Sequence, residues 1–188
     1  MGPKEIHNGI YIVGSSDISD AKDCCVYLLD LGELVLIDAG AGASAGSIAR
    51  NIEKLGFDPA SLSTIILTHC HIDHIGGAAA LEARSVAKIV MHELDARPVE
   101  HGDQRMTAAG WYGVKFQPLQ VDHKFSASRE VLTIDGHEVV LLHTPGHTPG
   151  SISVYLDKDG KRVLFGQDIH GPFLADFGAN MTDWRASM

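Results

Sequence analysis

The chain has 188 residues, 45% of them hydrophobic, which is enough to build one substantial core without disulfide or metal staples. It carries 15 Lys and Arg against 24 Asp and Glu, a formal net charge of -9. That balance lacks the basic surface that binding to phosphate backbones requires. We therefore predict a single domain over residues 1–188 and exclude nucleic acid as a partner.

The sequence shows no sign of export or of membrane attachment. Its first residues, MGPKEIHNGIYIVG, lack the basic and apolar regions of a signal peptide, and no apolar stretch has the length needed to cross a bilayer. The three cysteines are an odd set, and Cys24 and Cys25 are adjacent, which makes a poor disulfide framework. These features predict a cytoplasmic protein with no membrane partner.

Strand-like runs open the chain. Branched and aromatic residues concentrate in 10–13, 24–30 and 33–38, a composition typical of β-strands. The Leu31-Gly32 break between the last two runs indicates a hairpin.

An amphipathic helix is expected next, over residues 44–55. Ile48, Ile52 and Leu55 recur at helical spacing, and Gly56 supplies a C-terminal stop. One face of this helix should therefore pack on the strands.

A strand, helix, strand unit follows. TIILT (64–68) has the apolar character of a buried strand, GGAAALEAR (76–84) that of a small-residue helix, and KIVMH (88–92) that of another strand. A Gly- and Pro-punctuated middle, roughly 93–128, separates this unit from four further predicted strands. Turn signals such as Asp135-Gly136 divide them: VLTI (131–134), EVVLLH (138–143), SISVYL (151–156) and KRVLFG (161–166).

The junction after the first strand of that unit holds an unusual cluster, THCHIDHIGG (68–77). In an extended segment His69 and His71 project to the same side, while Asp73 and His74 follow as the chain turns. Imidazole and carboxylate groups are ligands for zinc, iron or manganese. The cluster therefore predicts a metal-binding loop.

This run resembles the HxHxDH signature of the metallo-β-lactamase superfamily, and three other segments resemble further landmarks of that family. LIDAG (36–40) precedes the cluster, and HTPGHTPGS (143–151) and LFGQD (164–168) follow it. The last two are most similar to the glyoxalase II-like branch. The resemblance implies an α/β (α+β) fold of the metallo-β-lactamase type, an αβ/βα sandwich of two mixed sheets with helices outside.

The resemblance also implies a dinuclear metal site. One ion would be held by His69, His71 and His147, and the second by Asp73, His74 and a further histidine. Asp168 would bridge the two ions, and Asp38 would support the loop by hydrogen bonding. Zinc is the expected metal, with iron and manganese as alternatives.

Hydrolysis is the chemistry that such a site implies. Two divalent ions about 3.5–4 Å apart lower the pKa of a shared water, so that a metal-bound hydroxide is available near neutral pH. Asp73 would orient this hydroxide and is the predicted catalytic residue. The expected reaction is hydrolysis of a small-molecule thioester, ester or lactone.

The end of the chain departs from the family pattern. The family's last histidine ligand lies well beyond the bridging aspartate, whereas only His170 follows Asp168 here. We expect a chain that lacks the family's C-terminal part, with a second site that is incomplete or is completed by His170, water or a neighbouring chain. The uncovered surface then predicts a homo-oligomer or strand exchange. The final residues, MTDWRASM, should begin a helix with Asp183 as its N-cap.

Two other functions remain open at this level. The same motifs also resemble those of the iron-dependent persulfide dioxygenases, which hold one iron with two histidines and one aspartate. On this reading the reaction would be an oxidation by oxygen instead of a hydrolysis. A metal-binding module without turnover is the other alternative, because the last ligand is missing.

Three features outside the predicted ligand set have weaker signals. His143 is expected to be a packed residue rather than a ligand, and Cys70 a structural one, since alternation points it away from its histidine neighbours. Segment 102–125 is either a substrate lid with exposed aromatic residues or a helical hairpin.

Overall fold

The computed structural model describes residues 1–188, and the chain divides into two compact units. The first unit comprises residues 1–67 and 71–90, and the second comprises residues 68–70 and 91–188. The expected single domain over the whole chain stays a prediction. None of the helices has the length and apolar character needed to span a membrane.

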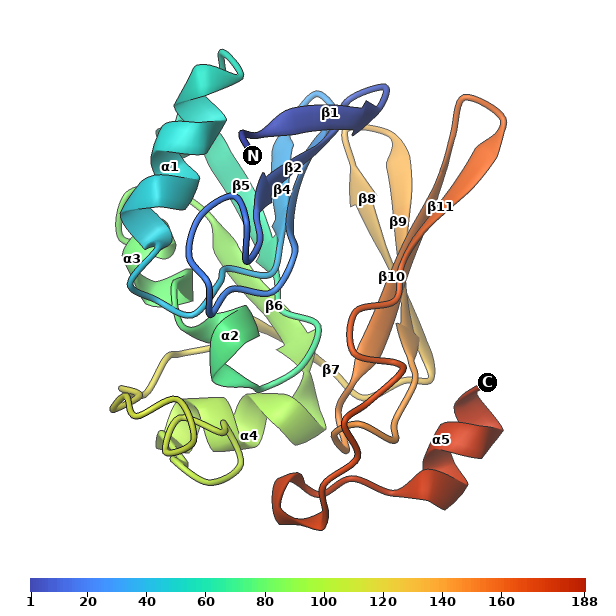
Figure 1. Ribbon diagram of the computed structural model, residues 1–188. Coiled ribbons are helices and arrows are strands. Elements are labelled where there is room, and N and C mark those ends of the chain that lie inside the picture. Colours follow the sequence, from blue (N-terminus) through green and yellow to red (C-terminus); the bar gives the residue numbers. More distant parts are fainter. The chain divides into compact units, whose positions relative to one another are not determined.

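A mixed β-sheet forms the centre of the first unit (Figure 1). Its strands follow one another in chain order, antiparallel from β1 to β4 and parallel from β4 through β5 to β6. The predicted hairpin is confirmed, since Asp30 pairs with Leu34 across the Leu31-Gly32 turn. The sheet has seven strands, of which the first six are β1 (Lys4–His7), β2 (Ile10–Gly14), β3 (Val26–Asp30), β4 (Leu34–Ile37), β5 (Leu62–Ile66) and β6 (Lys88–His92).

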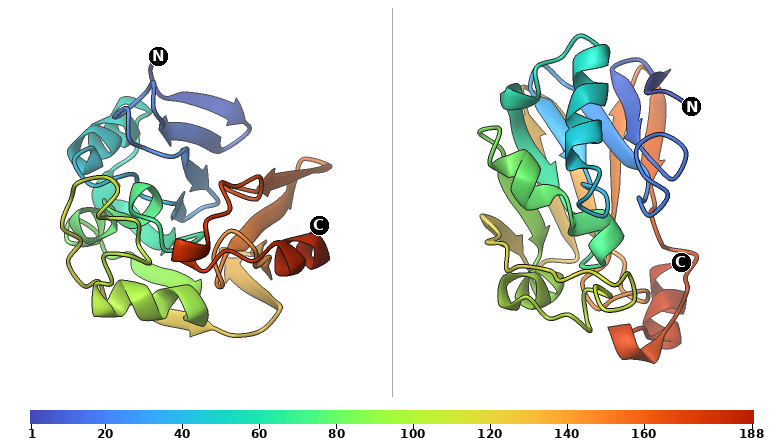
Figure 2. Two further views of the ribbon diagram at one scale, coloured as in Figure 1. Left: turned by 60° about the horizontal axis from the view of Figure 1, so that its bottom comes forward. Right: turned by 60° about the vertical axis from the view of Figure 1, so that its left-hand side comes forward.

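Helices α1 (Ala45–Lys54) and α3 (Ala78–Glu82) lie on one face of this sheet (Figure 1; Figure 2, right). The predicted helix over 44–55 is confirmed as α1, whose Ile48 and Ile52 are fully buried. The predicted helix over 76–84 is shorter in the structure, and a separate single turn, α2 (Ile72–Ile75), precedes it. A 3₁₀ turn, η1 (Pro59–Ser61), leads into β5.

The second unit contains an antiparallel sheet in the order β11-β10-β9-β8. The four predicted strands are confirmed as β8 (Arg129–Ile134), β9 (His137–His143), β10 (Ile152–Lys158) and β11 (Lys161–Phe165). Both residues of each predicted turn, Asp135-Gly136 and Asp159-Gly160, have positive φ, the conformation that suits tight hairpins.

Segment 102–125 has little regular structure. Residues 102–122 connect α4 (Glu93–His101) to the short strand β7 (His123–Phe125) through turns and irregular chain, so the helical-hairpin alternative is wrong. Gly102, with φ of 63°, ends α4 in the left-handed conformation, and Gly113 repeats that conformation further on. These breaks prevent a continuous helix, while the lid alternative stays a prediction.

The chain ends in η2 (Ala175–Phe177) and α5 (Met181–Ser187). Asn180, and not the predicted Asp183, is the N-cap of α5, because its side chain accepts hydrogen bonds from the first-turn amides. The backbone amide of Asn180 donates to the carbonyl of Gly146 at 2.9 Å, and the Ser187 hydroxyl donates to the carbonyl of Pro145 at 2.8 Å. Helix α5 thus lies against the loop between β9 and β10 (Figure 2).

Candidate metal centre

The carboxyl ends of two parallel strands carry Asp38 and the candidate ligands of the first unit. Asp38 directly follows β4, and its amide donates to the carbonyl of Ile66 at the end of β5 at 2.9 Å. Asp38 has φ of 62°, a left-handed conformation that is uncommon for a residue other than glycine. This bend turns the chain at the strand end, and the side chain is fully buried.

His74 links this aspartate to the histidine cluster. Its Nδ1 atom lies 2.7 Å from Oδ2 of Asp38, and both side chains are buried. Its Nε2 atom lies 3.6 Å from Oδ2 of Asp73. Asp73 and His74 belong to α2, for which His71 is the buried N-terminal flanking residue. Asp38 therefore holds one ring nitrogen of His74 while the other faces Asp73.

Cys24 lies beside this pair, and no sequence motif marks it as a candidate ligand. Ligand atoms of Cys24, Asp38 and His74 lie within 4.8 Å of one another. Burial raises the pKa of the Cys24 thiol to about 12, although the neighbouring His74 lowers it. With this pKa the Cys24 thiol is protonated at neutral pH in the metal-free protein.

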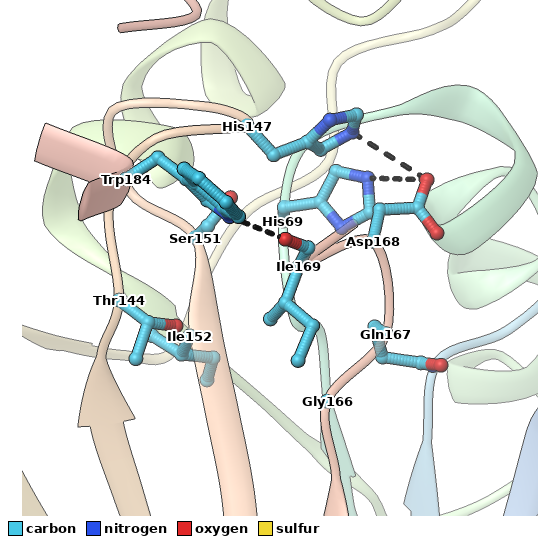
Figure 3. A pocket seen from close by; sticks show the side chains of 10 residues that line it. All are labelled: His69, Thr144, His147, Ser151, Ile152, Gly166, Gln167, Asp168, Ile169 and Trp184. Carbon is cyan, nitrogen blue, oxygen red and sulfur yellow. Dashed lines mark hydrogen bonds and ion pairs between the residues drawn. The ribbon is translucent and has the colours of Figure 1, made fainter. Parts of the chain in front are cut away.

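In the second unit, three residues from distant parts of the chain converge. Nε2 of His147 lies 3.5 Å from Oδ2 of Asp168, and Nε2 of His69 lies 4.0 Å from the same oxygen (Figure 3). The two imidazole rings meet edge to face, with centroids 4.7 Å apart. His69 follows β5, His147 lies in the loop after β9, and Asp168 follows β11.

The other nitrogens of these two rings have partners of their own. His147 Nδ1 lies 2.8 Å from the carbonyl oxygen of Pro172, and His69 Nδ1 lies 3.2 Å from the hydroxyl of Thr68. Because a carbonyl oxygen only accepts hydrogen bonds, Nδ1 of His147 carries the hydrogen and the lone pair of its neutral ring is on Nε2. That lone pair is on the side of Asp168.

This donor set fits a transition-metal ion. With zinc–ligand distances of about 2.0–2.2 Å, two ligands at a tetrahedral angle lie about 3.4 Å apart. Two pairs of candidate ligand atoms are close to this separation. His147 Nε2 lies 3.5 Å from Asp168 Oδ2, and His74 Nε2 lies 3.6 Å from Asp73 Oδ2. Both pairs also show the hydrogen-bonded Nδ1 that is typical of metal-binding histidines.

Nearby residues have structural contacts instead. His143 donates from Nε2 to the carbonyl of Pro149 at 2.8 Å and stacks on His92, so it is packed as the sequence predicted. The thiol of buried Cys70 donates to the carbonyl of Met106 at 3.3 Å, and burial raises its pKa well above the ordinary value. His170 is exposed.

The stacked pair predicts a pH-dependent stability. The rings of His92 and His143 lie 3.8 Å apart at an angle of 10°, and burial, followed by the charge of His143, lowers the pKa of His92 to about 4. The unfolded chain binds this proton near pH 6.5, whereas the folded chain binds it only near pH 4. The free energy of unfolding therefore has its full value above pH 6.5 and decreases as the pH falls toward 4. We expect the urea midpoint of metal-free protein to fall between pH 7 and 5, and to fall less in His92→Phe, which keeps a ring against His143. Equal slopes in the two proteins would contradict this assignment.

Comparison with known proteins shows which protein family this chain is similar to. A sequence model described as the metallo-beta-lactamase superfamily matches residues 22–170. A probable metallo-hydrolase of Methanocaldococcus jannaschii is 30% identical over 68% of this chain, and a hydroxyacylglutathione hydrolase of Haemophilus influenzae is 30% identical over 79% of it. The chain spans 60% and 66% of the lengths of these two relatives.

A solved structure is similar over the whole chain. It is a metallo-beta-lactamase from Cronobacter sakazakii that is 29% identical, with a TM-score of 0.82 covering 100% of this chain and 74% of its own. The predicted fold class, an αβ/βα sandwich of the metallo-β-lactamase type, is therefore confirmed.

Proposed function

Because the chain belongs to the metallo-β-lactamase superfamily, we propose that it is a metal-dependent hydrolase that cleaves a thioester, ester or lactone in a small molecule. The similarity to a hydroxyacylglutathione hydrolase supports this substrate class, since an acylglutathione is a thioester. The chain spans only part of the length of these relatives. The activity of the whole protein is therefore part of the proposal.

The proposed metal centre takes its ligands from the residues described above. His69, His71 and His147 would hold one zinc ion, Asp73 and His74 a second, and Asp168 would contact both. The observation that carries the proposal is the convergence of His69, His147 and Asp168 from three separate segments of the second unit. An isolated polar loop would not need such a convergence.

Each side chain has a distinct part in the proposed reaction. Bound zinc supplies Lewis-acid chemistry and a water of lowered pKa. The Asp73 carboxylate, which is partly exposed, accepts a hydrogen bond from the attacking water and orients it. Asp38 keeps the hydrogen on Nδ1 of His74, and the Pro172 carbonyl does the same for His147. Both rings therefore have a lone pair on Nε2 with which to coordinate a metal ion.

The test combines metal content with turnover. Protein purified without added metal is analysed by plasma mass spectrometry and assayed on an acylglutathione, an aryl ester and an N-acyl homoserine lactone. We expect bound zinc and hydrolysis of at least one substrate, with both strongly reduced in Asp168→Asn. Asp183→Asn, which changes an exposed carboxylate on α5, should retain both.

Other results would redirect the assignment. One iron per chain with oxygen-dependent turnover would support the dioxygenase alternative. Bound metal without any hydrolysis would support a binding module, and absence of bound metal after incubation with zinc would contradict the proposed centre.

A further inference from the structure

Asp95, in the first turn of α4, is a fully buried carboxylate outside the predicted ligand set. Its Oδ2 atom accepts hydrogen bonds from the amide of Cys70 at 2.8 Å and from the hydroxyl of Thr148 at 2.6 Å. Its Oδ1 atom accepts from the amide of Gly150 at 2.6 Å. Three such donors partly offset the cost of burying a carboxylate, although burial still raises the pKa of Asp95, and they make the contacts strong and directional.

These hydrogen bonds join the two segments that carry the candidate histidines of the second unit. Cys70 directly follows His69, and Thr148 directly follows His147. The amide of Ile152 also donates to the carbonyl of Thr68 at 2.9 Å, which ties the same two segments on their other side. Asp95 therefore fixes the backbone immediately next to each imidazole, without contacting either ring.

The loop between β9 and β10 is built around this carboxylate. The hydroxyl of Ser151 lies 2.7 Å from that of Thr148 and accepts from the Thr148 amide at 3.0 Å, which orients Thr148 toward Asp95. A Cβ atom on Gly150 would lie 2.5 Å from the Asp95 nitrogen and 2.6 Å from its Oδ1 atom. Glycine at 150 is thus required by the close approach of α4.

We propose that Asp95 is a positioning residue for the metal centre, which acts through Cys70 and Thr148 to hold His69 and His147 at the separation that metal binding needs. The inference rests on the proposed function, because it assumes that these two histidines are ligands. It adds a determinant of metal affinity that lies 25 residues from Cys70 and 53 residues from Thr148 in the sequence.

Asp95→Asn is the direct test. The amide has the same shape but only one acceptor oxygen, so at least one of the three donors faces an NH2 group instead. We expect the zinc affinity, measured by competition with a chromophoric chelator, to fall about 10- to 100-fold, the range found when groups that orient metal ligands are removed. The visible absorption of the cobalt-substituted protein should change as well, because it reports ligand geometry.

A matched control separates positioning from general stability. Asn51 of α1 is also buried and donates to the carbonyl of Val13 at 2.9 Å, in the first unit and without contact to any candidate ligand. Asn51→Ala should lower the urea midpoint while leaving the zinc affinity and the cobalt spectrum unchanged.

A second pair of variants keeps the proposal testable if Asp95→Asn does not fold. Thr148→Val removes the hydroxyl that donates to Asp95, whereas Thr148→Ser retains it. Zinc affinity should fall in the first and be preserved in the second.

The outcomes distinguish the two levels of inference. If the wild-type chain binds zinc and the Asp95 and Thr148 variants bind it equally well, Asp95 is only structural and this inference is overturned. If the wild-type chain binds no zinc, the proposed function fails and the inference fails with it.

Discussion

His147→Ala is expected to lower zinc affinity by more than about 100-fold and to reduce hydrolysis by about 1000-fold or more, since several kcal/mol of transition-state stabilisation depend on the metal. The Nε2 atom of His147 lies 3.5 Å from Oδ2 of Asp168, and its Nδ1 atom donates to the Pro172 carbonyl, so the ring is oriented for a ligand role. Metal content per chain and kcat/KM on the responsive substrate are the measurements.

His101→Ala supplies the matched control for this experiment. His101 is an exposed histidine at the end of α4, in the same unit, and its Nδ1 atom donates to the carbonyl of Arg97 at 2.7 Å. Zinc content and turnover should both stay at the wild-type level. Equal metal content in the two variants would contradict a ligand role for His147.

The second large effect concerns stability and comes from Gly77, the second glycine after the histidine cluster. A Cβ atom at this position would lie 2.1 Å from the carbonyl oxygen of Ala39, a backbone atom that cannot move aside. Its φ of -87° is accessible to alanine, so the clash alone decides the result. We expect Gly77→Ala to lower the free energy of unfolding by about 3 kcal/mol or more, as severe overpacking does.

Gly46→Ala is the control for this prediction, with an effect of opposite sign. Gly46 lies within α1, and a Cβ atom there would meet only the end of the Arg50 side chain, at 3.6 Å. Since alanine is the better helix former, this variant should be more stable by about 0.5–1 kcal/mol. Urea unfolding of both variants is the measurement, and a Gly77 variant as stable as wild type would show that the loop after α2 can shift away from Ala39.

The helices and strands were readable from the sequence where the signal is local. Alternating apolar residues and Asp-Gly turns act between near neighbours in the chain, so strands β8 to β11 and their two tight hairpins follow from the sequence. The same holds for α1, where the period of Ile48 and Ile52 matches one helix face. The dense run of residues 69–74 likewise indicated metal binding from side-chain chemistry alone.

Local signals failed where contacts distant in sequence decide the conformation. The cap of α5 is Asn180 rather than Asp183, because the chain reaches α5 from a position tied to Gly146. The irregular path of 102–122 depends on left-handed turns and on burial of Phe116 and Leu119, which no period in that segment reveals.

The identity of the candidate ligands was thus predicted from the sequence, whereas their environment was decided by the tertiary structure. That Asp38 holds His74, that the Pro172 carbonyl holds His147 and that Asp95 joins the two histidine-bearing segments depends on atoms brought within 3 Å from distant parts of the chain. Side-chain chemistry is a property of single residues, but a hydrogen bond between distant residues exists only after folding has placed both partners.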